Sequence, residues 1–208
     1  CAELLKAHSQ EEVSYQNLGR NAYFSGEIKE AIKLLTKAIE INSKDSVSYD
    51  LRGRARMIIK DYKGSISDYN MALEIDPKNS DLYVLRGHTF KKDGDARQAI
   101  LDYSKAIEIN PDLANAYYAR GNVKEEINDL KGACIDWKKS AELGDEDANR
   151  SFNLNCQGLS QEEINSIKDS QISSNKNAEK YDISADEKVE SGNFEGAVED
   201  YTKSLEII

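Results

Sequence analysis

Residues with a type and spacing suited to catalysis are scarce in this chain. His8 and His88 are the two histidines available as bases near neutral pH. No GxxxxGK[ST], HExxH, GxSxG or GxGxxG string occurs. Acidic pairs such as Asp145 with Asp147 could form carboxylate dyads, but among 38 acidic residues they are more simply solvated charges. The sequence therefore predicts no catalytic residues, no cofactor and no enzyme.

The three cysteines, Cys1, Cys134 and Cys156, also give no reactive pattern. They form no CxxC pair and have no histidines at metal-ligand spacing, so neither a disulfide framework nor a metal site is expected. Cys134 is expected to be a small buried apolar group on a helix. A reducing, cytoplasmic location is the default expectation. Cys1 leaves two interpretations open, an expression fragment or a periplasmic or membrane-tethered lipoprotein processed at that cysteine.

Composition narrows the classes of partner. The chain is 39% hydrophobic and 32% charged, which is typical of a soluble protein, and its net charge is -10. General affinity for nucleic acid needs clustered cations, so nucleic acid is not an expected partner. No apolar run approaches the roughly 18 residues that a membrane span needs. The expected partner is a protein or peptide.

A repeated structural unit becomes visible when the sequence is compared with itself at a shift of 34 residues. Tyrosines, glycines and a bulky column then come into register: Tyr15, Tyr49, Tyr83 and Tyr117; Gly19, Gly53, Gly87 and Gly121; Leu35, Tyr69, Tyr103 and Trp137. Two columns of small residues accompany them: Ala31, Ser65, Ala99 and Ala133; Ala38, Ala72, Ala106 and Ser140. A fixed period of this kind indicates stacked units.

Each unit shows two helical patterns, helix A and helix B, separated by a breaker such as Gly26 or Gly94. In the third unit the pattern predicts helix A over about residues 80–92 and helix B over about 96–108. Glycine inside a helix costs about 1 kcal/mol against alanine. Its recurrence inside helix A therefore predicts close packing, with the bulky column filling the space between helices.

These columns, with the strings Tyr-x-Leu-Arg-Gly and Ala-Ile-x-Asp-Tyr-x-Lys-Ala-Ile-Glu-Ile-x-Pro, resemble the tetratricopeptide repeat family. The resemblance implies an all-α fold, an α-solenoid of antiparallel helix pairs stacked into a right-handed superhelix. Lys60 departs from the pattern because a turn glycine is expected there. The expected organisation is an N-terminal helical segment, four repeats, an intervening stretch and a truncated fifth repeat: 1–11; 12–45, 46–79, 80–113 and 114–147; 148–177; 178–208.

The stretch 148–177 lacks the columns, although Ser160 and Glu163 form a capping-box pattern before further apolar residues. Two interpretations remain open. The stretch is either a degenerate hairpin that continues the stack, or a capping helix followed by a linker.

Arginine and aspartate recur together in the later repeats. Arg52, Arg86 and Arg120 precede the helix A glycines, and Asp68, Asp102 and Asp136 precede the helix B aromatics. The first unit has Leu18 and Leu34 at these two places. Structural pairing between the helices explains this joint appearance most simply, and ligand binding by the arginines is the alternative.

The family resemblance places helix A along a concave groove. Residues expected to face it are Arg20, Tyr23 and Phe24 in the first unit; Val47, Asp50, Arg54, Met57 and Ile58 in the second; Val84, His88 and Lys91 in the third; Tyr118 and Asn122 in the fourth. Arg20, Arg54 and His88 share one repeat position, about 10 Å apart on ordinary helix packing. We expect this groove to bind an acidic, partly apolar segment, unless the charges cluster there by chance.

The clamp by which some members of the family hold chaperone C-termini uses lysine, asparagine and arginine side chains. The matching positions here carry Gln16, Arg20, Leu51, Asp81 and Leu85, so the clamp is missing. The leading hypothesis is a scaffold or adaptor whose groove binds a peptide or protein segment. The alternative is self-assembly into a homo-oligomer through the chain ends, chiefly the last helix, which has no capping helix after it.

Overall fold

The computed structural model describes residues 2–156 and 158, with side chains from residue 13 onward. The chain divides into two compact units, residues 1–152 and 153–208. Almost all of the second unit, including the expected fifth repeat at 178–208 and most of the stretch 148–177, lies outside the described residues. The described repeats belong to the first unit.

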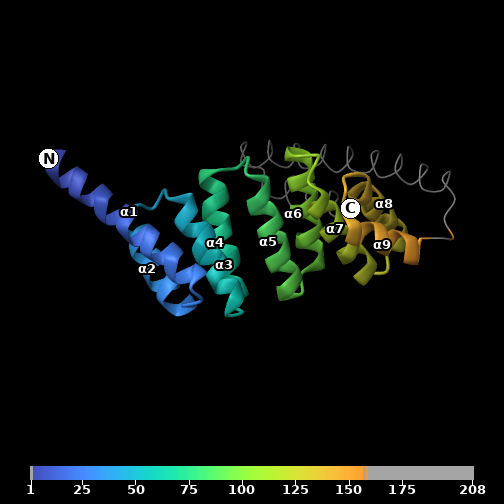
Figure 1. Cartoon of the computed structure of the whole chain (residues 1–208), viewed down its shortest axis with the longest axis horizontal. Helices are drawn as coiled ribbons and strands as arrows, with labels where there is room; N and C mark the ends of the chain where they lie inside the picture. Colours follow the sequence, from blue (N-terminus) through green and yellow to red (C-terminus); the bar gives the residue numbers. More distant parts are fainter. Residues whose placement is uncertain (1, 157, 159–208) are drawn as a thin grey trace, which may run out of the picture. The chain divides into compact units, whose positions relative to one another are not determined.

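The described residues form helices and no strands (Figure 1). In chain order the helices are α1 (Ala2–Phe24), α2 (Ile28–Ile41), α3 (Ser46–Ile58), α4 (Tyr62–Ile75), α5 (Ser80–Asp93), α6 (Ala96–Ile109), α7 (Ala114–Glu126), α8 (Leu130–Glu142) and α9 (Glu146–Asn155). The two helices predicted for the third unit are confirmed as α5 and α6, to within one residue at each end. Helix α1 continues without a break across the expected boundary after residue 11.

Consecutive helices pack as hairpins, α1 with α2, α3 with α4, α5 with α6, and α7 with α8. Each hairpin then packs on the next through α2 with α3, α4 with α5, and α6 with α7. Helices α1, α3, α5 and α7 also contact one another in succession and form one wall of the unit, called here the helix A wall. The prediction of an all-α solenoid is confirmed.

Capping side chains and residues with a positive φ mark the ends of several helices. The carboxylates of Asp61, Asp95 and Asp129 accept hydrogen bonds from the backbone in the first turns of α4, α6 and α8. The turn before α6 contains Gly94 at a φ of +92°, which glycine adopts without strain. Lys60 occupies the same left-handed region at +63°, so its repeat keeps the turn without glycine.

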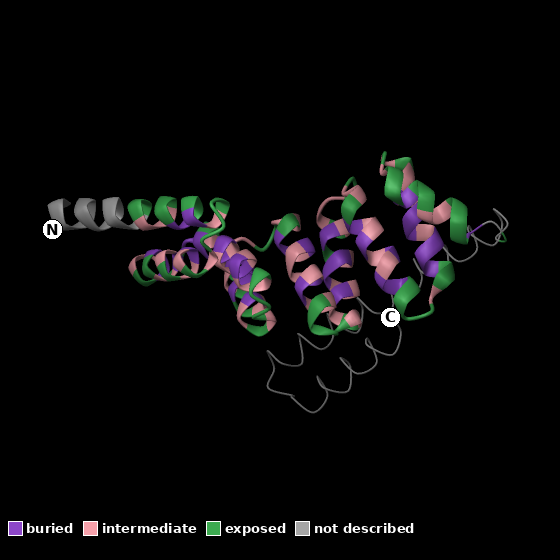
Figure 2. Cartoon of the chain, turned by 60° about the horizontal axis from the view of Figure 1, so that its bottom comes forward, coloured by how far each residue is buried: buried purple, intermediate pink, exposed green. Residues whose placement is uncertain are grey.

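The bulky column lies against the helix A glycines, as the sequence predicts. A Cβ atom added at Gly53 would lie 3.0 Å from Tyr69 Cε1, and one added at Gly121 would lie 2.8 Å from Trp137 Cδ1. Buried residues accordingly follow the surfaces where neighbouring helices meet (Figure 2). Glycine is required here for space rather than for its backbone freedom.

The arginines of the later repeats connect three helices each. Arg86 on α5 donates from Nε and Nη2 to Asp102 on α6, and from Nη1 to Asn70 on α4. Arg52 and Arg120 repeat this arrangement with the pairs Asp68 and Thr36, and Asp136 and Ser104. The structural interpretation of the arginine and aspartate pattern is therefore confirmed.

The expectation about the cysteines is wrong. Cys134 is buried on α8 as expected, but it is disulfide-bonded, and so is Cys156 just after α9. Disulfide formation depends on distances that the fold sets, which the spacing of three cysteines along the chain does not reveal.

Candidate functional site

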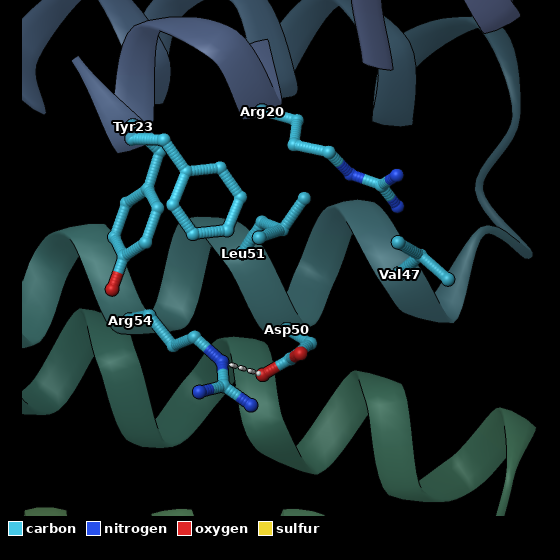
Figure 3. A pocket seen from close by; sticks show the side chains of 7 residues that line it. Arg20, Tyr23, Val47, Asp50, Leu51 and Arg54 are labelled. Atoms are coloured by element: carbon cyan, nitrogen blue, oxygen red, sulfur yellow. Dashed lines mark hydrogen bonds and ion pairs between the residues drawn. The ribbon is translucent and has the colours of Figure 1, made fainter. Parts of the chain in front are cut away.

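A pocket of about 450 Å³ lies on the helix A wall between α1 and α3 (Figure 3). We call it the α1–α3 pocket. Its lining consists of Arg20, Tyr23, Phe24, Val47, Asp50, Leu51 and Arg54. Helices α1 and α3 belong to the first two repeats, so the pocket spans one boundary between repeats.

The apolar part of the α1–α3 pocket is exposed to water. Phe24 is 75% exposed and Val47 is 40% exposed, whereas Leu51 is buried beneath them. The rings of Tyr23 and Phe24 meet edge to face, with centroids 5.3 Å apart. Water contact with this surface is unfavourable, so covering it with another apolar group would release free energy.

The charged residues of the α1–α3 pocket differ in how they are bound. Arg54 Nε donates to Asp50 Oδ1 at 2.8 Å, and Figure 3 shows this pair on α3, across Leu51 from Arg20 on α1. Burial alone would lower the pKa of Arg54, but the hydrogen bond and the charge of Asp50 raise it, so the guanidinium stays charged. Arg20 is exposed and has no acidic partner among the described residues.

The residue that follows each helix A glycine has a different hydrogen-bond partner in different repeats along the helix A wall. In the fourth repeat Asn122 Oδ1 accepts from Trp137 Nε1 at 2.8 Å. In the third repeat the Tyr103 hydroxyl lies 2.8 Å from His88 Nδ1. The later repeats thus pair this residue with the bulky side chain behind it.

The first two repeats lack that pairing. Arg54 pairs with Asp50 instead. The buried hydroxyl of Tyr69, behind Arg54, makes no hydrogen bond of ordinary geometry. Nearby Ser65 acts to lower the pKa of that hydroxyl. Burial has the larger effect and raises the pKa of Tyr69. In the first repeat the bulky residue is Leu35, which offers no polar atom to Arg20. The residue after the helix A glycine is therefore bonded to the bulky side chain behind it in the third and fourth repeats but not in the first two.

His88 does not extend the positive surface. Burial, together with the charges of Lys91 and Lys92, lowers its pKa below the ordinary value. The imidazole is therefore neutral at pH 7. The positive charge at this repeat position therefore comes from the two arginines, Arg20 and Arg54.

Models of the tetratricopeptide repeat match three stretches of the chain, residues 13–45, 69–100 and 87–128. The chain is a tetratricopeptide repeat protein. None of the curated proteins matches it in sequence.

Several solved structures share this tetratricopeptide fold. A crystal structure of MamA is 24% identical, with a TM-score of 0.64 over 71% of this chain and 86% of that one. The first repeat domain of Spaghetti (RPAP3), solved with the HSP90 peptide SRMEEVD, is 22% identical, with a TM-score of 0.56 over 58% of this chain and 95% of that one. YrrB, described as a tetratricopeptide protein with an unusual peptide-binding site, is 17% identical, with a TM-score of 0.59 over 99% of this chain and 91% of that one.

The residues predicted for the tetratricopeptide groove fall into two sets. Six of them come together at the α1–α3 pocket: Arg20, Tyr23, Phe24, Val47, Asp50 and Arg54. The remaining ones lie elsewhere: Met57, Ile58, Val84, His88, Lys91, Tyr118 and Asn122.

Besides His88 and Asn122, three residues of this second set make identifiable contacts. Val84 is only 4% exposed and belongs to the core with Tyr103, so its prediction as a groove residue is wrong. Lys91 Nζ pairs with Glu126 Oε1 at 2.8 Å, which joins α5 to α7. Met57 Sδ accepts a weak hydrogen bond from Thr89.

Leu51 is the lining residue that sequence reasoning missed as part of a binding site. It entered only as a position where the chaperone clamp fails. An apolar residue inside a repeat helix carries no signal that separates a pocket floor from the core.

Within the described residues, no group of three or more histidine, cysteine or acidic side chains could hold a metal ion. No helix in that part of the chain is long and apolar enough to cross a membrane.

Proposed function

We propose that this protein is a scaffold or adaptor that binds a segment of another protein on the helix A wall, over α1 and α3. The α1–α3 pocket carries the proposal, because it combines the exposed Phe24 with an Arg20 that has no acidic partner among the described residues. Apolar contact supplies free energy, and the guanidinium supplies charge-assisted hydrogen bonds that orient the segment. The peptide-bound RPAP3 domain and the peptide-binding site of YrrB support this use of the fold.

A binding role suits the lining better than catalysis does. The pocket contains no cysteine, serine, threonine, lysine or histidine, and its one carboxylate is paired with Arg54. Neither a nucleophile next to a base nor a pair of carboxylates is available there.

The site also differs from the chaperone clamp. Gln16 donates through Nε2 to the Asp45 carboxylate, and Leu51 is an apolar floor rather than a polar ligand. We therefore do not propose a chaperone C-terminus as the ligand. Self-assembly through the last helix concerns residues 178–208, which lie outside the described residues.

Panning a phage library of random twelve-residue peptides against the immobilised protein tests the proposal. Selected clones should lose binding about tenfold or more to the double variant Phe24→Ser/Val47→Ser, which removes the exposed apolar surface of the pocket. The matched control is Ile127→Ser/Leu130→Ser, which changes two other exposed apolar residues, 51% and 43% exposed, at the end of α7 and the start of α8. Clones that bind both variants equally, or a failure to select any clone, would contradict the proposal.

We also propose that the protein works in an oxidising compartment, against the expectation of a cytoplasmic one. The disulfide-bonded state of Cys134 and Cys156 supports this, because such bonds persist mainly outside reducing compartments. Protein isolated without reductant should therefore show both cysteines unlabelled by iodoacetamide in denaturant, as read by peptide mass spectrometry. Labelling of either cysteine without prior reduction would contradict the proposal.

A further inference from the structure

The charge of the α1–α3 pocket narrows the class of segment that it can bind, if the proposed function holds. Two guanidiniums and one carboxylate line the pocket, so its lining has a single excess positive charge. This local sign opposes the net charge of -10 of the whole chain. An acidic group is repelled by most of the surface and attracted here.

Asp50 decides which of the two arginines is available. It accepts from Arg54 Nε at 2.8 Å and compensates that charge. Arg20 stands on the opposite side of the pocket, near Val47, with its guanidinium turned away from the Arg54 and Asp50 pair (Figure 3). A ligand carboxylate that enters the pocket therefore meets Arg20 as its strongest attraction and Asp50 as its strongest repulsion.

The single excess charge favours one carboxylate rather than two. The end of a chain that carries an acidic last residue brings two negative groups close together. The second would have to approach Asp50 or displace it from Arg54, and either step opposes binding. An internal segment brings one acidic side chain without a terminal carboxylate.

The apolar residues set the second requirement. Tyr23, Phe24, Val47 and Leu51 surround the same space that the arginines border. A ligand that supplied only charge would leave Phe24 and Val47 in water. A bulky apolar side chain beside the acidic one would cover them, and its contribution scales with the area it buries.

We infer that the α1–α3 pocket binds an internal segment of a partner protein in which one acidic side chain accompanies one bulky apolar side chain. Arg20 pairs with the carboxylate, and the apolar side chain rests against Phe24 and Leu51. Asp50 limits the affinity because it holds Arg54.

The clones selected above provide the first test, because peptides joined to a coat protein at their C-terminus have no free terminal carboxylate. Most clones that depend on Phe24 and Val47 should carry an aspartate or glutamate within two residues of a leucine, isoleucine, methionine or aromatic residue. The strongest clone is then synthesised with both ends blocked, and its affinity is measured by fluorescence anisotropy. Replacing its acidic residue by the matching amide should weaken binding about tenfold.

Variants of the protein test which side chains attract and repel the acidic group of the peptide. Arg20→Gln should remove the difference between the acidic and amide peptides, and Asp50→Asn should strengthen binding of the acidic peptide by about three- to tenfold. Lys63→Gln on α4 is the matched control, since Lys63 is exposed outside the pocket, and it should change neither affinity. Circular dichroism checks that each variant keeps its helicity. A version of the peptide that ends at its acidic residue with a free carboxylate should bind no tighter than the blocked peptide.

The outcomes separate this inference from the proposed function. Clones that depend on Phe24 and Val47 but lack an acidic residue, or that bind Arg20→Gln unchanged, overturn the inference and leave the proposed function standing. Tighter binding of the peptide that ends in a free carboxylate would overturn the inference that the bound segment is internal. If no clone depends on Phe24 and Val47, the proposed function fails, and the inference fails with it.

Discussion

The two halves of the helix A wall are built on one repeat but differ in how their polar groups are used. Over α5 and α7, His88 and Asn122 bond the aromatic residues behind them, and Lys91 pairs with Glu126. Over α1 and α3, Arg20 has no acidic partner among the described residues, and Arg54 bonds Asp50. The Tyr69 hydroxyl, on α4 behind Arg54, makes no hydrogen bond of ordinary geometry. The difference teaches that the residue after the helix A glycine can bond the aromatic side chain behind it in some repeats and not in others, while the packing columns stay intact.

The largest expected effect comes from the buried charges of the fourth repeat. Asp136 accepts from Arg120 and pairs with Lys124 at 3.0 Å. Burial raises the pKa of Asp136, but the two cations outweigh this and lower it, so the carboxylate is charged. Asp136→Ala should reduce the free energy of unfolding by about 3–5 kcal/mol, because it leaves two buried cations unpaired.

Urea unfolding followed by circular dichroism measures this loss. The matched variant is Leu34→Ala, which changes the equivalent position of the first repeat and removes only packing, at a cost of about 1–2 kcal/mol for a half-buried leucine. Equal losses for the two variants would mean that the later repeats are not more strongly coupled than the first.

A smaller effect compares two tyrosines at one repeat position. Tyr103→Phe should cost about 0.5–1.5 kcal/mol because it removes the hydrogen bond to His88. Tyr69→Phe should be neutral or stabilising, since it removes a buried hydroxyl without a hydrogen bond of ordinary geometry. Thermal and urea unfolding of both variants measure the difference. A loss for Tyr69→Phe as large as that for Tyr103→Phe would show that the Tyr69 hydroxyl has a partner in solution.

The smallest effect is a dependence of stability on pH at His88. Its pKa is lowered in the folded state, so the folded protein binds this proton less readily than the unfolded chain does. The contribution of His88 is fully present above its ordinary pKa of about 6.5 and is lost as the pH falls below it. The slope cannot exceed about 1.4 kcal/mol per pH unit for one proton.

Unfolding measured from pH 7.5 to 5 in wild type and in His88→Asn, which copies Asn122 of the next repeat, tests this dependence. The difference in unfolding free energy between the two should shift against wild type as the pH falls. A constant difference would show that His88 already titrates as it does in the unfolded chain.

The sequence predicted the fold well because the repeat records packing directly. The helix A glycines and the bulky column identify the same contact from both sides, and the spacing of 16 residues that joins Arg86 to Asp102 recurs in each later repeat. Lysine at position 60, where glycine is expected, did not affect the prediction of the fold, since a turn of this kind tolerates a lysine with a positive φ.

The candidate site was harder to predict because exposure and charge depend on distances between helices. Helical spacing alone placed Val84 on the groove, whereas the neighbouring repeat buries it. His88 shares the repeat position of Arg20 and Arg54, but burial keeps it neutral at pH 7. The sequence also did not indicate that Arg54 pairs with Asp50. The disulfide-bonded state of Cys134 was missed for the same reason.

The arginines that connect three helices also affect how the repeats come apart. Arg52 ties α2 to α4 through Thr36 and Asp68, and Arg86 and Arg120 continue the chain of ties to α8. Releasing any helix from α3 to α8 separates a buried aspartate from its arginine, so these helices should open together as one cooperative block. Helix α1 has Leu18 at the corresponding place and takes no part in the series. Helix α1, which carries Arg20, Tyr23 and Phe24, can therefore detach and rejoin at a lower cost in free energy. The amide hydrogens of α1 should exchange with solvent before those of α4 to α8.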